Sequence, residues 1–327
     1  MKILLFLLTA FSLFAKPSIV FIHLGKELPD YLPNAVSQAR LFNECPIYLI
    51  ANECALQTIP DELQKARAIC VAAESLLSEP QHEWFKRVSR LDRHFRGGFW
   101  LFTTERFFYL YELMKKYDLS DVFHLEYDNM LYANVQSLLP VFYRFYSGKI
   151  GATFDNDNRC VAGFFYVADR HPLGKFLEFV VKNVRKETND MGFLAGFRNS
   201  EEGFCIEQLP IVGPSYVEER GLRSAYNHVT SRPELFFNHF EEFQSVFDAA
   251  ALGQYLGGED PSNGNKGPGF INESCLFNPS FFQYEWRQDV AGRLVPFLVY
   301  RNVAWPIVNL HIHCKNLKLF HSGREKP

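Results

Sequence analysis

Several motifs that define large enzyme classes are missing from this sequence. It contains no C-x-x-C pair, no G-x-G-x-x-G after its first apolar segment, no Walker loop and no G-x-S-x-G elbow. These absences argue against a zinc cluster, a Rossmann dinucleotide site, a P-loop and a hydrolase nucleophile. Lys and Arg form no long run and the net charge is -3, so nucleic acid is not an expected partner.

The composition is that of a packed globular protein. The chain has 327 residues, of which 47% are hydrophobic, and it contains 33 Phe. This length allows one large domain or two. No linker or internal repeat divides the chain, so we expect one domain with a sheet-centred core over residues 16–327.

Residues 1–15 differ from the rest of the chain. Lys2 precedes thirteen uncharged residues rich in Leu and Phe, a run shorter than the ~20 residues of a membrane span. The pattern predicts a secretory signal peptide with Ala15 before the cleavage site. The alternatives are a buried N-terminal strand or a degenerate anchor. We therefore expect a secreted, lumenal or periplasmic protein without an integral membrane span once the signal is removed.

Cysteine usage is indecisive. The seven cysteines are widely spaced, and their odd number excludes complete pairing. Most are expected to be small buried apolar side chains, while export leaves room for one or two disulfides.

The N-terminal third alternates apolar strands with a helix. Residues 17–25 form an apolar strand followed by a glycine turn, residues 33–42 fit a helix, and residues 46–51 form a second apolar strand. Residues 69–73 form a candidate third strand. This order predicts parallel pairing and an α/β fold, and the continuous apolar strands predict a sheet covered on both faces.

A longer helix precedes the most informative segment. Thr103 or Thr104 is a candidate cap for a helix that ends at about Tyr117, with apolar residues at helical spacing. Beyond it, residues 150–154 and 160–168 alternate like two further strands.

Two more segments complete the pattern. A helix is expected over residues 172–184. Residues 259–269, rich in Gly and Asn, predict a loop that is either a mobile lid or a surface excursion.

Residues 121–128 read D-V-F-H-L-E-Y-D, an apolar strand that ends in Glu126 and Asp128. Side chains at i and i+2 of a strand point the same way, and ligands collect at the carboxyl ends of strands in open α/β sheets. Carboxylate oxygens suit Mg²⁺ and Mn²⁺. The pair therefore predicts a divalent metal site, and the alternative is a solvated strand end.

Residues 308–315 read V-N-L-H-I-H-C-K. On a strand, His311, His313 and Lys315 would share one face. Imidazole completes the coordination of Mn²⁺, and an ammonium group is a point charge for phosphate. The segment predicts metal and phosphate ligands, against the alternative of histidines that only bond to neighbours.

Arg106, near the start of the helix before the acidic strand, is a candidate to reach a phosphate or to stabilise the acidic pair. The alternative is a surface ion pair with Glu105 or Asp121, which would contribute little.

Two further aspartates are candidate catalytic groups. Asp190 either caps a helix or faces the reacting group. Asp248 opens a small-residue helix, where it is either a general base or a helix cap. Gln254 in that helix is a candidate ligand for hydroxyl groups. His23 follows the first strand and completes the candidate ligand-binding set.

Together these residues resemble the GT-A fold glycosyltransferases. That family is one nucleotide-binding α/β domain with a D-x-D motif at the end of a central strand, which Glu126-Tyr127-Asp128 resembles as an E-x-D variant. The resemblance implies that Glu126 and Asp128 hold Mn²⁺ or Mg²⁺ against a donor diphosphate. His311 or His313 would add a metal ligand, and Lys315 would bind phosphate. The H-x-H-x-K spacing departs from the H-x-x-G-x-x-K form of one well-known branch of that family.

The implied activity is metal-dependent transfer of a sugar from a nucleotide-diphosphate sugar to a hydroxyl of a glycan, lipid or protein acceptor. Asp248 is the expected base for inversion of configuration, and Asp190 the expected group for retention. The alternatives are a non-catalytic carbohydrate-binding protein of the same fold and a metal-dependent hydrolase.

Overall fold

The computed structural model describes residues 16–186, 188–264 and 266–324. The predicted signal peptide, residues 1–15, lies outside the described residues, so its assignment stays a prediction.

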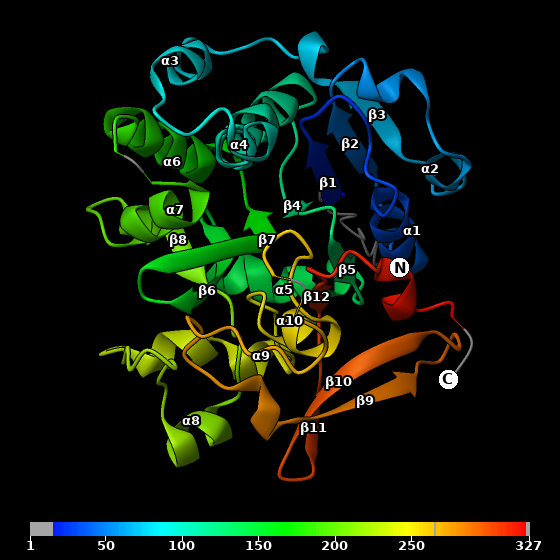
Figure 1. Ribbon diagram of the computed structural model, residues 1–327, viewed down its shortest axis with the longest axis vertical. Coiled ribbons are helices and arrows are strands. Elements are labelled where there is room, and N and C mark those ends of the chain that lie inside the picture. The colour runs from blue at the N-terminus through cyan, green and yellow to red at the C-terminus, as the bar shows by residue number, and fades with distance from the viewer. Residues whose placement is uncertain (1–15, 187, 265, 325–327) are drawn as a thin grey trace, which may run out of the picture.

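Within the described residues, a mixed sheet of seven strands forms the centre of the molecule, in the order β3-β2-β1-β4-β7-β6-β8 (Figure 1). The strands from β3 to β4 are parallel, β7 is antiparallel to β4 and β6, and β8 is parallel to β6. This confirms the predicted α/β fold with a mostly parallel, mixed sheet. The strand bounds are β1 (Ser18–His23), β2 (Ile47–Ala51), β3 (Ile69–Ala72), β4 (Val122–Leu125), β6 (Ile150–Asn156), β7 (Arg159–Val167) and β8 (Ile206–Gln208).

Helices cover the sheet, which explains the continuous apolar strands. Every residue of β1, β2, β4 and β6 is buried, as expected for strands covered on both faces. The helices are α1 (Leu32–Phe42), α2 (Asp61–Lys65), α3 (Pro80–Val88), α4 (Phe99–Lys116), α5 (Val135–Phe145), α6 (Arg170–Asn183), α7 (Asp190–Arg198), α8 (Pro214–Arg220), α9 (Phe240–Phe243) and α10 (Leu252–Gly257).

Helices α3, α4, α6 and α7 form a contiguous layer, and α7 also packs along β7 (Figure 1). Phenylalanine fills the space between this layer and the sheet. Phe107 of α4 contacts Phe165 of β7 and Phe176 of α6, with ring centroids 5.0 and 5.4 Å away. Phenylalanine side chains of this kind pack the helices against the sheet.

Helix α4 starts earlier than the sequence predicts. Gly97 and Gly98 have φ values of 67° and 98°, and the helix begins at Phe99 directly after this left-handed turn. The prediction that Thr103 or Thr104 caps the helix is wrong. Both hydroxyls lie inside it and donate to the carbonyl of Trp100, at 3.2 and 3.1 Å.

The C-terminal part of the chain returns to the centre of the fold. Strand β12 (Asn309–His311) pairs antiparallel with β5 (Asn129–Leu131), which follows the acidic segment. Between them in sequence, β9 (Gln283–Gln288), β10 (Leu294–Tyr300) and β11 (Val303–Pro306) form a separate antiparallel sheet, orange in Figure 1.

The seven cysteines are all free, so the described residues contain no disulfide. Nor does the described part of the chain include a helix with the length and apolar character needed to cross a bilayer.

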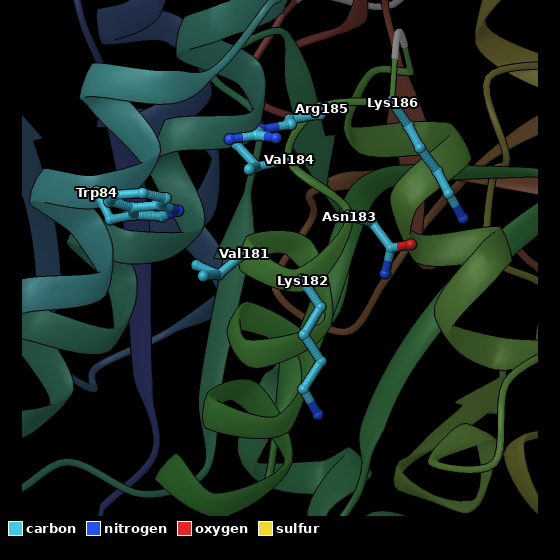
Figure 2. A pocket seen from close by; sticks show the side chains of 7 residues that line it. All are labelled: Trp84, Val181, Lys182, Asn183, Val184, Arg185 and Lys186. Atoms are coloured by element: carbon cyan, nitrogen blue, oxygen red, sulfur yellow. The ribbon is translucent and has the colours of Figure 1, made fainter.

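A hollow of about 400 Å³ lies beside α3 and the C-terminal end of α6 (Figure 2). It is lined by Trp84 and residues 181–186.

A buried ion cluster joins α3 to α4. His82 of α3 is fully buried, and its two ring nitrogens lie 2.8 Å from Glu112 Oε1 and 3.0 Å from Glu105 Oε1. Two carboxylates facing both nitrogens favour the doubly protonated ring. Burial by itself would lower the pKa of His82, but the hydrogen bonds and charges of Glu105 and Glu112 outweigh it and raise this pKa above its usual value.

We expect this cluster to make stability depend on pH. A histidine whose pKa is raised on folding contributes stability fully below its unfolded pKa of about 6.5 and loses it as pH rises through the folded value. His82→Gln should therefore cost most below about pH 6.5, and the difference from wild type should shrink above it. Urea unfolding across this range measures the effect, with exposed His171→Gln as the control. A pH-independent cost for His82→Gln would contradict the charged-histidine interpretation.

Candidate active site

The acidic pair lies at the carboxyl edge of the parallel strands, but in a turn and not on a strand. Strand β4 ends at Leu125, and β5 begins at Asn129. The Glu126 N–H donates to Gly163 O at 3.1 Å, and the Asn129 N–H closes the turn on Glu126 O at 2.9 Å. The prediction that Glu126 and Asp128 converge because side chains alternate along a strand is therefore wrong. The turn between β4 and β5 brings them together.

The pairing of β5 with β12 brings the C-terminal histidines to this turn. His311 stands opposite Asn129 in the register, and the Ile312 N–H donates to Asp128 O at 2.8 Å. A backbone ladder thus joins segments that are far apart in sequence.

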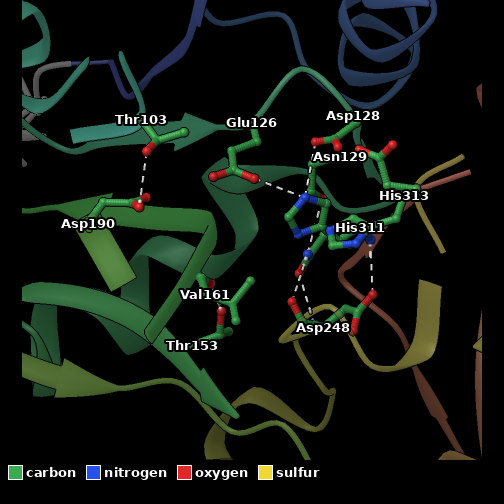
Figure 3. Close-up of polar contacts among 12 residues, drawn as sticks. Thr103, Glu126, Asp128, Asn129, Thr153, Val161, Asp190, Asp248, His311 and His313 are labelled. Atoms are coloured by element: carbon green, nitrogen blue, oxygen red, sulfur yellow. Dashed lines mark hydrogen bonds and ion pairs between the residues drawn. The ribbon is translucent and has the colours of Figure 1, made fainter. Parts of the chain in front are cut away.

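Acidic and basic side chains converge at this junction (Figure 3). His311 Nε2 lies 2.9 Å from Glu126 Oε2 and 3.0 Å from Asp128 Oδ1. The Lys315 ammonium pairs with Asp128 Oδ2. One ligand atom from each of Asp128, His311 and His313 lies within 4.8 Å of the others, so these three residues are positioned to hold a metal ion.

The H-x-H-x-K segment is not a continuous strand, which corrects the prediction. Strand β12 ends at His311, and the chain then turns, with the Lys315 N–H donating to Ile312 O at 3.2 Å and Lys315 at φ 62°. The rings of His311 and His313 meet edge to face, with centroids 4.3 Å apart. A turn, and not alternation, directs the three side chains to one place.

The charged groups at the junction shift one another's pKa values. Burial favours neutral carboxyl groups, but the guanidinium of Arg106 holds the pKa of Glu126, and the ammonium of Lys315 that of Asp128, well below the usual range. Burial would lower the pKa of His311, but Asp128 and Glu126 outweigh it and raise this pKa to about 10. Two anions, Glu126 and Asp128, thus face three cations, Arg106, His311 and Lys315.

His313 behaves in the opposite way. Burial, together with the positive charge on His311, lowers the pKa of His313 to about 3. The ring is therefore neutral, and a neutral imidazole is the form that binds a metal.

Arg106 lies in the middle of α4 and is buried, so its predicted place near the helix start is wrong. Its guanidinium pairs with Glu126 Oε1 and, at 2.8 Å, with Asp190 Oδ2. It does not form the surface pair with Glu105 or Asp121 that was the alternative. Arg106 thus pairs with Glu126, one member of the acidic pair, and its role in binding a phosphate stays a prediction.

Asp190 does not cap α7. Asn189 is the N-cap, and its side chain accepts from the Gly192 N–H at 3.2 Å. Asp190 is the first helical residue and is 3% exposed. Its second oxygen accepts from the Thr103 hydroxyl at 3.1 Å (Figure 3). Asp190 is therefore part of the site, held by Arg106 and Thr103.

The structure contradicts the prediction that Asp248 is a general base. Its side chain is fully buried, and both oxygens accept backbone N–H groups at 2.8–2.9 Å. The donors are those of Ala251, Leu252, Gly253 and His311. Such a carboxylate has no free lone pair directed at a substrate. Asp248 instead joins the first turn of α10 to strand β12.

The two remaining candidates lie beside the histidines and the acidic turn. Gln254 of α10 contacts His313 Nδ1 with its amide nitrogen, so it holds that ring. His23 ends β1 and packs against the edge of Tyr127, 5.1 Å between centroids. Its two buried nitrogens form no hydrogen bond of normal geometry with another described residue. Burial lowers the pKa of His23, and the backbone of Glu27 partly opposes this.

The structure adds residues that sequence reasoning missed. Asp260 Oδ2 lies 3.9 Å from Lys315 Nζ and 3.6 Å from Arg96 Nη1, which places the predicted Gly/Asn-rich loop beside the site. Gly163 of β7 packs against His311. The acidic pair Glu259-Asp260 at the start of the loop was a possible signal for Asp260, but no local pattern marks Gly163.

Comparisons with known proteins assign no family. No family model matches the chain, and no curated protein sequence matches it. The crystal structure of mouse xyloside xylosyltransferase 1 is similar with a TM-score of 0.45 and 10% identity, over 68% of this chain and 93% of that one.

Two further solved structures are similar at the same low level. The PaToxG glycosyltransferase has a TM-score of 0.40 and 11% identity, over 56% of this chain and 68% of that chain. An active-site mutant of LgtC has a TM-score of 0.39 and 16% identity, over 68% and 83%. Likeness this distant gives the chain neither a family nor an activity.

We expect Gly163 to be required for the position of His311. A Cβ at this residue would lie 2.6 Å from both His311 Nδ1 and Asn129 Nδ2, far inside normal contact. Gly163→Ala should destabilise the protein by about 1–3 kcal/mol and weaken Mn²⁺ binding at least about tenfold. Denaturant unfolding and calorimetric titration measure the two effects.

Gly267→Ala is the matched control, because a Cβ there would meet no atom within 4 Å. If Gly163→Ala bound Mn²⁺ as wild type does, the close packing of Gly163 on His311 would not govern the site.

Proposed function

We propose that this protein is a metal-dependent glycosyltransferase that moves a sugar from a nucleotide-diphosphate sugar to an acceptor hydroxyl. One observation carries the proposal: Glu126 and Asp128, at the carboxyl end of a central strand, are met by His311, His313 and Lys315. The distant resemblance of the sequence to GT-A enzymes agrees with this chemistry.

The residues at the junction fit a divalent cation. Asp128 offers a carboxylate oxygen, and His311 and His313 offer imidazole nitrogens, all within 4.8 Å of one another. This mixture of oxygen and nitrogen ligands suits Mn²⁺ better than Mg²⁺, which prefers oxygen alone. The buried Asp128 and the half-buried Glu126 also require positive charge, which Arg106, His311 and Lys315 supply. When bound, the cation would neutralise negative charge on a leaving diphosphate.

In this proposal Lys315 acts on the same leaving group. Its ammonium pairs with Asp128 and lies 3.9 Å from Asp260. Once a cation neutralises Asp128, that ammonium can pair with a phosphate oxygen. Charge stabilisation of this kind usually contributes most to transfer from a diphosphate donor.

His23 supports a place for the rest of the nucleotide. It lies at the carboxyl end of β1, next to the acidic turn, and neither buried nitrogen forms a hydrogen bond of normal geometry with another described residue. Tyr127 packs on His23 and also lies 5.9 Å from the ring of Tyr31. Aromatic faces beside these ring nitrogens suit a nucleobase, which both stacks and forms hydrogen bonds.

Asp190 stays our candidate for the carboxylate near the transferred sugar. Arg106 holds it in one network with Glu126. To accept a proton it must first release the hydrogen bonds from Arg106 and Thr103. The proposal also includes an acceptor hydroxyl on a glycan, lipid or protein. It includes export of the protein as well, which rests on the signal peptide expected in residues 1–15.

Asp128→Ala should abolish the metal-dependent reaction. We expect the hydrolysis of UDP- and GDP-sugars with Mn²⁺ to fall at least about a hundredfold, because the cation loses its central ligand. Asp61→Ala, an exposed aspartate on α2, is the matched control. Equal turnover by Asp128→Ala and wild type would remove the basis of the proposal.

The same assay separates the alternatives. Sugar binding that is indifferent to a chelator, without turnover, would indicate a non-catalytic carbohydrate-binding protein. Release of free sugar or phosphate that stays the same when an acceptor with hydroxyl groups is added would indicate a hydrolase.

Metal binding should release a proton. The pKa of His311 is about 10, so its ring is protonated at neutral pH and must lose a proton to become a ligand, whereas His313 is already neutral. Below about pH 10 the affinity for Mn²⁺ should therefore rise with pH by up to about tenfold per unit. Calorimetry in two buffers of different ionisation enthalpy would count the proton. An affinity that stays constant between about pH 6.5 and about pH 8.5 would exclude this exchange.

A further inference from the structure

The hollow beside α3 and the end of α6 takes no part in the site described above, yet its lining is chemically distinctive. Figure 2 shows Trp84 on one side, with Val181, Val184 and Arg185 facing it. The Trp84 ring is 38% exposed, so one part of it is packed and the other is open to the hollow.

The rim of the hollow is positively charged. Lys182, Arg185 and Lys186 are exposed, and their side chains have no hydrogen bond or ion pair to another described residue. Arg87 adds a fourth cation, with its guanidinium 4.9 Å from the centre of the Trp84 ring. In a chain of net charge -3, this is a local excess of positive charge.

Among the described residues, the acidic groups of α3 and α6 do not cancel this excess. Glu83 is paired with Lys86 at 2.5 Å, and Glu178 lies 3.6 Å from Lys175. Both acids are thus matched by cations other than those of the rim. Positive side chains near a helix C-terminus also stabilise the helix dipole, but that effect requires neither a hollow nor an exposed indole.

The hollow is linked to the candidate active site through α7. Residues 187–189 connect Lys186 to Asp190, whose carboxylate pairs with Arg106. Helix α3 packs on α4, which carries Arg106 and Thr103. The hollow and the candidate active site are therefore built on neighbouring helices, α3 and α6 for the hollow and α4 and α7 for the site.

We propose that this hollow binds an anionic glycan. A sugar ring would stack on Trp84, and its carboxylate, sulfate or phosphate group would pair with Arg185. Anionic groups further along the glycan would pair with Lys182 and Lys186, whose side chains extend away from Trp84 (Figure 2). An indole suits the apolar face of a sugar, and the cations supply charge complementarity. This proposal extends the proposed function, because the role of the glycan as an acceptor requires the protein to be a glycosyltransferase. The binding of the glycan does not rest on it.

The geometry favours a glycan over a membrane surface. A side chain that anchors a protein to lipid must project its apolar part into the bilayer interface. Trp84 instead lines a hollow and is more than half covered. A flexible chain of sugars can enter such a hollow, whereas a bilayer cannot.

Binding of the full-length protein to dextran sulfate, polygalacturonate and uncharged dextran tests the proposal, without metal or donor. We expect both anionic polymers to bind and dextran not to bind, with affinity falling as salt rises. Arg185→Gln combined with Lys186→Gln should weaken binding about tenfold. Lys65→Gln with Arg67→Gln removes the same charge from the α2 region and should change little.

The aromatic wall has its own test. Trp84→Ala should weaken binding of the anionic polymers, and Trp84→Phe should restore most of it, because a ring face remains. Equal binding by wild type and the Arg185/Lys186 double variant would overturn the proposal. So would binding to vesicles of phosphatidylserine and phosphatidylcholine without binding to either anionic polymer.

Enzyme kinetics separate this proposal from the transferase proposal. Arg185→Gln with Lys186→Gln should raise KM for an anionic glycan acceptor and leave donor hydrolysis unchanged. If the double variant lowered the rate of transfer to the acceptor and the rate of donor hydrolysis equally, an acceptor role for the glycan would be excluded. Asp128→Ala should still bind dextran sulfate as wild type does, so a failure of the metal-dependent reaction leaves the glycan site independently testable.

Discussion

The antiparallel pairing of β5 with β12 is the interaction on which the rest of the site depends. It places His311 opposite Asn129, and its ring within 3.0 Å of Asp128. Without that pairing, the buried Asp128 and the half-buried Glu126 would share one turn with only Arg106 for a counter-charge. Burying unpaired charge is costly, so the fold must supply positive groups, and the C-terminal segment does so with His311 and Lys315.

The backbone around His311 is built for this contact. Asp248 binds the His311 N–H and the first turn of α10 with the same carboxylate, and a Cβ on Gly253 would collide with the His311 backbone. Gly163 leaves room for the ring on another side. A residue that resembles a catalytic base in sequence thus has a positioning role, because its oxygens are consumed by main-chain donors.

Local pattern accounts well for the elements of the fold and poorly for their ends. The apolar strands and the first helix are where their periodicity predicts, since continuous burial leaves a plain signature. The start of α4 was missed because a left-handed Gly97-Gly98 turn preceded the more familiar Thr103 signal. Glu126 and Lys315 were assigned to strands because alternation cannot distinguish a strand from the turn that ends it.

The sequence by itself determined an α/β sheet, an acidic pair at the end of one of its strands and a distant group of basic side chains. These depend on residue type and short spacing, which are local properties. Only the tertiary structure decided that Arg106 bridges Glu126 and Asp190. It also decided that backbone N–H groups occupy the carboxylate of Asp248, and that Trp84 faces Arg185 across a hollow. Burial and proximity between segments far apart in the chain govern charge and access, and neither is written in any local pattern.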